Sequence, residues 1–268
     1  MEIIDLSLPI DDEAFEMHPV KITRWEHKWG GDNFGKIWAK KQGLKARLRH
    51  LLGKKRIDHR SFKDEAFLSL ERVSATVHTG THLDSPYHYG PHCEGKQSPW
   101  IDEIPLEWCY GNGVVIDVSH KKPGEFITED DIKEALKKID YELKPYDIVL
   151  IRTGADKLWG TPKYHGQYPG MSREAVAYIV GCGVKVLGID TTGLDRPTQF
   201  MVKDYLATQD NSYLWPAHFY GREKAYWHME RLANLDKIPQ PHGFKVICFP
   251  VRIKNTGAAW VRAVAVIE

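Results

Sequence analysis

The strongest constraint on the fold is an alternation of strand-like and helix-like segments between residues 113 and 190. Three apolar, β-branched runs predict buried strands, at residues 113–118, 146–152 and 184–190. Thr128 and Asp131, three residues apart, predict the start of a helix through a capping pattern. Ser172 predicts the start of a second helix, which we expect to run through Val180 and to be stopped by Gly181 and Gly183. Helices that alternate with strands are typical of α/β proteins.

The two ends of the chain add further strands to this pattern. Residues 2–10 are β-prone, and residues 244–253 and 258–267 read as two adjacent strands, which predicts a mixed sheet. No stretch is rich enough in Pro, Gly or Ser to mark a linker. We therefore expect one α/β domain over residues 1–268, with a mixed β-sheet core and flanking helices.

Residues 24–66 differ in character from the rest of the chain. Ten Lys or Arg residues lie between Lys36 and Arg60. The apolar residues at roughly helical spacing are Ile37, Leu44, Leu48 and Leu51. This pattern predicts a helical insertion of one or two amphipathic helices with a solvated basic face. Two roles remain open for this insertion: an active-site lid and a subunit contact.

The composition excludes several classes of function. The chain carries a net charge of +1 and is 42% hydrophobic, so nothing demands a nucleic acid or a membrane as partner. No apolar run approaches the roughly 20 residues of a membrane span. The four cysteines form no CxxC pair, which favours a reducing, cytoplasmic location.

One eleven-residue segment carries a concentration of metal-binding side chains. It reads HTGTHLDSPYH and contains His78, His82, Asp84 and His88. Imidazole and carboxylate together suit Zn²⁺, Mn²⁺ or Fe²⁺ better than Ca²⁺ or Mg²⁺. Gly80 and Pro86 oppose a helix, so we expect the cluster where a strand at residues 72–77 runs into a loop. His82 and Asp84 are two residues apart and would point to one side of an extended chain.

This segment resembles the metal motif HxGTHxDxPxH of the cyclase family of metal-dependent hydrolases. The family includes bacterial kynurenine formamidases, isatin hydrolases and trans-dienelactone hydrolases. Further similar segments are residues 4–7, residues 149–154, residues 187–191, and a C-terminal signature of His218, Glu230, Asn234, Pro239, Gly243 and Phe244. Apart from residues 24–66, the resemblance covers most of the chain. It implies a swivelling β/β/α arrangement that assembles as a homodimer or homotetramer.

The resemblance also implies a role for each residue of the site. The implied metal ligands are His78, His82, Asp84, His218 and Glu230, and the implied general acid/base is His88. Asp84 and Glu230 would bridge two ions of Mn²⁺ or Zn²⁺. Some relatives that resemble isatin hydrolase use one Mn²⁺ and lack this Glu, so Glu230 favours the two-ion version. Two alternatives stay open: His88 as a fourth ligand, and His228 as a rival ligand.

The implied reaction is hydrolysis of a small amide, lactam or N-formyl substrate by metal-activated water, with His88 delivering a proton to the leaving group. A lactone hydrolase would use the same chemistry. A metal-binding interaction protein without catalysis is a third possibility, and the intact His88 argues against it.

Three departures from the family pattern leave the substrate open. The insertion at residues 24–66 is longer than in the compact formamidases. Gly193 stands where many relatives have Ser, and residues 258–260 read Ala-Ala-Trp where many have a Gly-Ser/Ala-Pro run. Within the insertion, Trp25 and Trp29 are candidates for stacking on an aromatic substrate.

Overall fold

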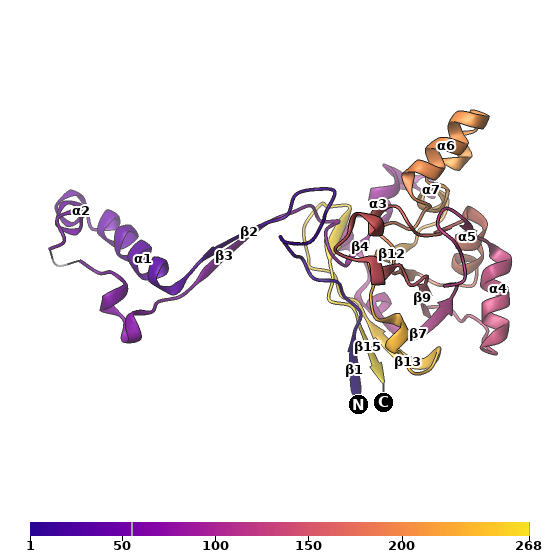
Figure 1. The fold of residues 1–268 in the computed structure, drawn as a ribbon, viewed down its shortest axis with the longest axis horizontal. Coiled ribbons are helices and arrows are strands. Elements are labelled where there is room, and N and C mark those ends of the chain that lie inside the picture. The colour runs from indigo at the N-terminus through magenta and orange to yellow at the C-terminus, as the bar shows by residue number, and fades with distance from the viewer. Residues whose placement is uncertain (55, 268) are drawn as a thin grey trace. The chain divides into compact units, whose positions relative to one another are not determined.

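The computed structural model describes residues 1–54 and 56–267, which form two compact units (Figure 1). The larger unit comprises Met1–His18 and the chain from Thr76 onward, and the smaller unit comprises Pro19–Ala75. The insertion expected at residues 24–66 lies inside the smaller unit, whose limits are wider than the sequence pattern indicated.

The larger unit is built on a mixed sheet of nine strands. In spatial order these are β1 (Glu2–Asp5), β15 (Val264–Ile267), β13 (His242–Ile247), β7 (Tyr110–Asp117), β9 (Ile148–Arg152), β11 (Val186–Ile189), β12 (Trp227–Glu230), β4 (His82–Asp84) and β14 (Ala258–Trp260). The central strands β7, β9, β11 and β12 run parallel, and the outer strands pair antiparallel. Four short strands form two small ribbons: β5 (His92–Cys93) with β6 (Lys96–Gln97), and β8 (Phe126–Ile127) with β10 (Gly170–Met171).

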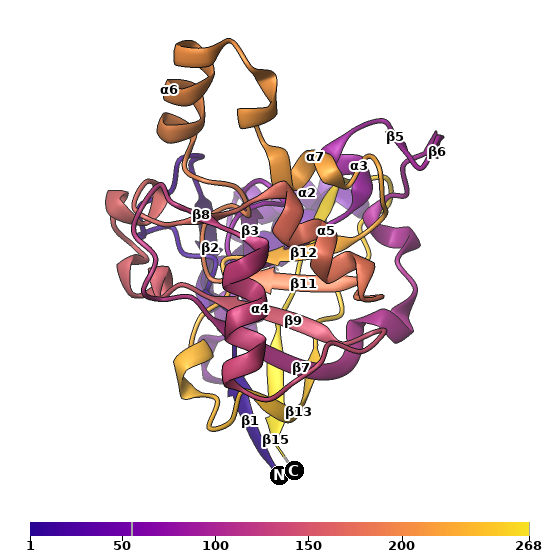
Figure 2. The ribbon, with the colours of Figure 1, turned by 90° about the vertical axis from the view of Figure 1, so that its right-hand side faces the viewer.

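Helices connect the parallel strands, as the alternation in the sequence predicts. The helices of this unit are α3 (Pro86–Tyr89), α4 (Glu129–Lys138), α5 (Arg173–Gly181), α6 (Thr198–Thr208) and α7 (Pro216–Tyr220). The predicted caps are confirmed: Thr128 and Asp131 form a capping box at the start of α4, and the Ser172 hydroxyl accepts the Ala175 N–H at the start of α5. Figure 2 shows α4 and α5 together on one face of the central strands. Short 3₁₀ turns lie at Ile101–Glu103, Leu106–Cys109, Ala155–Leu158, Pro162–His165, Asn211–Tyr213 and Leu235–Lys237.

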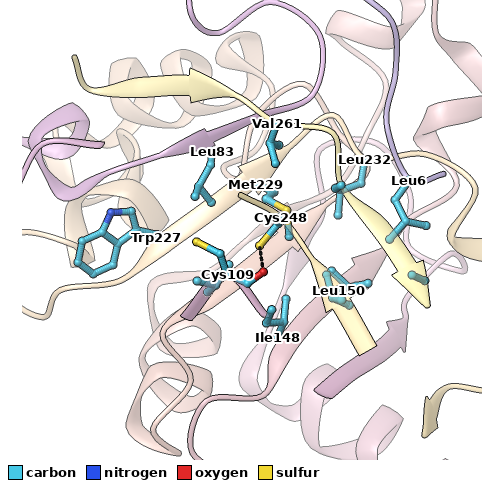
Figure 3. Packing of buried hydrophobic residues seen from close by; sticks show 14 of the residues in the cluster. Leu6, Leu83, Cys109, Ile148, Leu150, Trp227, Met229, Leu232, Cys248 and Val261 are labelled. Carbon is cyan, nitrogen blue, oxygen red and sulfur yellow. Dashed lines mark hydrogen bonds between the residues drawn. The ribbon is translucent and has the colours of Figure 1, made fainter. Parts of the chain in front are cut away.

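Two hydrophobic clusters fill the two faces of the sheet. Along β9, Val149 and Ile151 pack against α4 and α5, while Ile148 and Leu150 point into the opposite cluster. In that second cluster, drawn in Figure 3, side chains from the central and outer strands meet. Burying each such aliphatic side chain contributes about 1.5–3 kcal/mol. Both faces of the central strands are therefore covered, which explains their unbroken apolar sequence.

The last stretch of the chain corrects one sequence expectation and shows how the sheet is curved. Residues 258–267 were expected to form one strand, but they form β14 and β15, seven places apart in the sheet order. A flat sheet would separate these strands by about 34 Å at roughly 4.8 Å per strand. The chain from Trp260 to Val264 spans at most about 14 Å. The sheet must therefore curl so that β14 approaches β15, and Val261 and Ala263 of the connection are buried in the enclosed cluster.

The smaller unit combines a two-stranded ribbon with two helices. Its strands β2 (Lys21–Trp25) and β3 (Leu70–Ser74) pair antiparallel, and its helices are α1 (His27–Lys41) and α2 (Leu44–Leu51). Short 3₁₀ turns follow at His59–Ser61 and Lys63–Glu65. The helices agree with the predicted insertion, whereas the ribbon was missed. The strand expected at residues 72–77 ends at Ser74 as β3, so it does not run directly into the His cluster.

Among the residues that the structure describes, no helix combines the length and the apolar character needed to cross a bilayer.

Candidate metal centre

Two neighbouring strands bring four ligand-type side chains onto one face of the sheet. In the antiparallel pairing of β4 with β12, His82 lies opposite Glu230 and Asp84 lies opposite His228. Alternate residues of a strand share a face, so these four side chains project to the same side. The residues between them, Leu83 and Met229, are buried in the core cluster. The His-x-Asp pattern of residues 82–84 and the His-x-Glu pattern of residues 228–230 therefore belong to two paired strands that share one polar face.

The turn before β4 sets the orientation of the first histidines. Gly80 has a φ of +63°, a left-handed conformation that favours glycine. The Nδ1 of His82 lies 2.9 Å from the Gly80 carbonyl, to which it must donate, so in the neutral ring Nε2 is the nitrogen available to a metal. His78 lies in the turn itself, with its Nδ1 3.1 Å from Asp84 Oδ1.

Asp84 is the more deeply buried of the two carboxylates of the cluster. Its side chain has no exposure, and neither of its oxygens has a hydrogen-bond partner among the described residues; the Nε2 of His82 is likewise without one. Burial by itself would raise the pKa of Asp84, but its interactions with the surrounding histidines hold it below its usual range. A buried, ionised carboxylate without hydrogen bonds is costly unless it is paired. A divalent cation would satisfy these orphaned atoms, so the residues fit a metal.

Glu230 lies between several histidines. Its Oε1 accepts the Leu194 N–H at 2.9 Å and is 3.5 Å from His218 Nε2 and 3.0 Å from His228 Nε2. Its Oε2 is 3.5 Å from His82 Nε2. Burial would raise the pKa of Glu230, but the bonds and charges of the surrounding histidines lower it well below the ordinary value. Glu230 is therefore ionised, with one oxygen near His82 and the other near His218 and His228.

His218 approaches the cluster from α7 and is held there by Asp195. The Asp195 carboxylate accepts the N–H groups of Ala217 and His218 at the start of the helix, and its Oδ2 is 2.6 Å from His218 Nδ1. A carboxylate on one ring nitrogen of a histidine fixes the tautomer and leaves the other nitrogen free for a metal. The free Nε2 of His218 faces Glu230.

The described residues therefore contain two groups in which ligand atoms lie within 4.8 Å of one another. One group is His78, His82 and Asp84, and the other is Asp84, His218, His228 and Glu230. Asp84 belongs to both groups. The structure thus brings together all five residues predicted as metal ligands and adds the rival, His228. A third group, Asp32, Asp58 and His59, lies in the smaller unit, where Asp58 is already paired with Arg56 and Arg60.

His88 lies at the edge of the cluster and lines a cavity of about 410 Å³. Its Nε2 is 3.8 Å from Asp84 Oδ2, and its side chain is 36% exposed. Burial lowers the pKa of His88 to about 4, so the ring is neutral at neutral pH. A neutral imidazole at the edge of a cavity can accept a proton and then return it.

The structure also reveals residues that the sequence interpretation missed. Asp195 is one: it lies two residues after Gly193, next to the GIDT-like segment, and the resemblance was not used to give it a role. His18 and His165, to which the sequence pattern assigned no role, both line the cavity. Trp25 and Trp29 lie in the smaller unit, with ring centroids 5.1 Å apart in a stacked pair. Their part in substrate binding stays a prediction.

Replacing Asp195 by asparagine is expected to change the pH dependence of stability in the metal-free protein. Burial opposes protonation of His218, but the hydrogen bond and charge of Asp195 raise its pKa to about 9. Such a group contributes stability that is complete below its ordinary pKa of 6.5 and is lost as the pH rises through about 9. Between pH 6.5 and about 9, the free energy of unfolding of the wild-type protein should therefore fall, and that of D195N should fall less. Urea unfolding at several pH values measures this; parallel profiles would contradict the assignment.

Comparison with known proteins agrees with the geometry. A family model described as putative cyclase matches residues 4–196. An isatin hydrolase of Roseibium aggregatum is 25% identical over 223 residues, which cover 76% of this chain and 77% of that protein. The crystal structure of an isatin hydrolase bound to the product analogue thioisatinate gives a TM-score of 0.72 at 20% identity, over 100% of this chain and 92% of that one. A potential metal-dependent hydrolase with cyclase activity gives 0.64 at 19% identity, over 100% and 98%.

Proposed function

Because the chain belongs to the cyclase family, we propose that it is a metal-dependent hydrolase that opens or cleaves a small amide, lactam or N-formyl substrate. The likeness to isatin hydrolases supports carbon–nitrogen bonds as the target. The proposed ligands are His78, His82, Asp84, His218 and Glu230, and the proposed proton carrier is His88.

The observation that carries this proposal is the orphaned carboxylate of Asp84. Both of its oxygens are buried without hydrogen bonds, among histidines whose ring nitrogens converge on it. Mn²⁺ and Zn²⁺ suit such a set of imidazole and carboxylate groups. The cluster borders an open cavity, so a substrate can reach it from solvent.

The residues around the cavity have different roles in the proposed hydrolysis. When bound, a divalent ion supplies a water of lowered pKa and polarises a carbonyl oxygen. His88 is neutral and borders the cavity, so it can take a proton from the attacking water and deliver it to the leaving nitrogen. Asp195 holds His218 in one orientation, and the Gly80 carbonyl does the same for His82. Preorganised side chains avoid the cost of reorienting during the reaction.

A lactone hydrolase is the second candidate, since an alkoxide leaving group needs the same groups. The two are separated by assaying metal-free protein, and protein reloaded with Mn²⁺ or Zn²⁺, against N-formyl anilides, isatin-like lactams and unsaturated lactones. We expect turnover of the amide-type substrates only after reloading. Turnover of lactones alone would favour the second candidate, and no turnover with any ion would overturn both.

Replacing Gly193 by serine is expected to narrow the cavity beside Glu230. A Cβ at this position would lie 3.5 Å from Tyr168 Oη and 3.9 Å from Glu230 Oε1, which is ordinary contact, so folding should be preserved. A misfit in a pocket costs about 1–3 kcal/mol, so kcat/KM for bicyclic aryl substrates should fall about 10- to 200-fold. The smallest formamides should be affected less. Gly181→Ser is the control, because an added Cβ there meets no atom within 4 Å apart from its chain neighbours and the backbone of its own helix. Equal losses for all substrates would contradict the prediction.

A further inference from the structure

We infer that His228 is a metal ligand, and that it completes a closed ion position beside an open one. The closed position consists of Asp84, His218, His228 and Glu230, and the open position consists of His78, His82 and Asp84. This inference rests on the proposed function, since it divides the same site into two parts with different roles.

His228 is positioned by the strand pairing that builds the site. It lies directly opposite Asp84, with its Nε2 3.5 Å from Asp84 Oδ2 and 3.0 Å from Glu230 Oε1. The side chain has no exposure. Asp84 Oδ2 has no hydrogen-bond partner, although this imidazole nitrogen lies beside it. An ion shared by these atoms would satisfy Asp84, which the contact between His228 and Glu230 does not.

Tyr89 holds the other ring nitrogen of His228. The Tyr89 hydroxyl lies 2.8 Å from His228 Nδ1 and 3.3 Å from the carbonyl oxygen of Asp84. A carbonyl can only accept, so a hydroxyl that donates to it is free to accept the Nδ1–H of His228. The Nε2 is then unprotonated and suited to a metal. Without metal, the 3.0 Å hydrogen bond between His228 Nε2 and the ionised Glu230 places the proton on Nε2 instead, so a bound ion would have to displace this proton. If it does not, His228 is a structural residue.

The two positions differ in ligand number and exposure. Four protein ligands, all buried, surround the closed position, which is typical of metal sites that support structure. The open position has three protein ligands, and its His78, with a side chain that is 33% exposed, is the most exposed ligand of either position. The cavity is lined by His78 and also by His218 and Glu230 of the closed position. Sites with three protein ligands keep a place for water or substrate. The open position therefore serves the reaction, and the closed one binds its ion more tightly and holds Asp84 and Glu230 in place.

His228→Gln tests the inference, because glutamine can still donate an N–H to Glu230, but its neutral amide oxygen is a poorer ligand for Zn²⁺ than imidazole is. Protein stripped with a chelator is reloaded with Zn²⁺ or Mn²⁺, and ions per chain and affinities are measured by elemental analysis and calorimetry. We expect two classes of ion in the wild type. H228Q should weaken the tighter class by on the order of 100-fold or more, since even a residue that only orients a ligand is worth about 10- to 100-fold. His78→Ala should remove the weaker ion and keep the tighter one.

Two further variants complete the design. Tyr89→Phe should weaken only the tighter ion, by about tenfold, because His228 loses its orienting partner. His242→Gln is the control: this histidine packs against Tyr141 with ring centroids 4.9 Å apart, away from the cluster, and its replacement should leave both ions unchanged. Two ions bound to H228Q with wild-type affinities would overturn the inference while the proposed function stands. A wild type that binds no ion would overturn both. Circular dichroism of the metal-free variants shows whether they are folded. If H228Q is unfolded, the metal affinities of Y89F test the inference in its place.

Discussion

Replacing His88 by alanine is expected to lower kcat for hydrolysis by about 10²- to 10⁴-fold while leaving the bound metal in place. His88 is the titratable side chain proposed to move the proton, and general acid/base catalysis contributes rate factors of this size. Its Nε2 lies 3.8 Å from Asp84 Oδ2 at the mouth of the cluster, so it is near the ligands without being enclosed by them. Steady-state kinetics together with elemental analysis of the same sample measure both effects.

A matched control for this variant is His92→Ala. His92 is an exposed histidine on the β5–β6 ribbon, close to His88 in sequence, and its removal should leave kcat unchanged. If H88A instead loses an ion in proportion to its activity, His88 is a fourth ligand. If H88A keeps both metal and full activity, the proton must be carried by another group.

Replacing Asp84 by asparagine is expected to abolish metal binding at both positions. Asp84 is shared by the two groups of ligand atoms, with Oδ1 near His78 and His82 and Oδ2 near His228. Asparagine would offer one neutral oxygen and replace the other with an amide that cannot bind a cation. Hydrolysis should fall to the level of the metal-free wild-type protein.

The same variant gives a readout in stability that is independent of activity. Metal at about 100 times its Kd should stabilise the wild type by about 2.7 kcal/mol, and a chelator should reverse this shift. D84N should show no difference between the two conditions. Asp117→Asn changes an exposed carboxylate that pairs with Arg152 and should keep the full metal-dependent shift. A D84N protein that is still stabilised by metal would contradict the central role given to Asp84.

The local parts of the fold could be predicted because their signals are contiguous. The capping box at Thr128, the cap at Ser172 and the apolar strand of residues 146–152 each depend on neighbours within a few residues. The strand expected at residues 258–267 failed for the opposite reason. Its composition is β-prone throughout, and only the closure of the sheet, which places β14 and β15 near opposite edges, breaks it into two.

The candidate site was likewise predictable where its residues are close in sequence, and was not where they are far apart. The motif from His78 to His88 was recognisable because its ligand types lie within one short segment. The partnership of Asp195 with His218 spans 23 residues and depends on how α7 begins, so no local pattern contained it. The position of His228 opposite Asp84 depends on the register between two strands far apart in the chain.

The sequence by itself therefore determined the class of fold, the ligand types and the segment that concentrates them. These follow from backbone propensity and side-chain chemistry, which act over a few residues. The tertiary structure decided which atoms meet: the two cross-strand pairs of β4 and β12, the carboxylate behind His218 and the cavity beside His88. Such contacts depend on the register and curvature of the whole sheet, because burial of its two apolar faces sets where each strand lies.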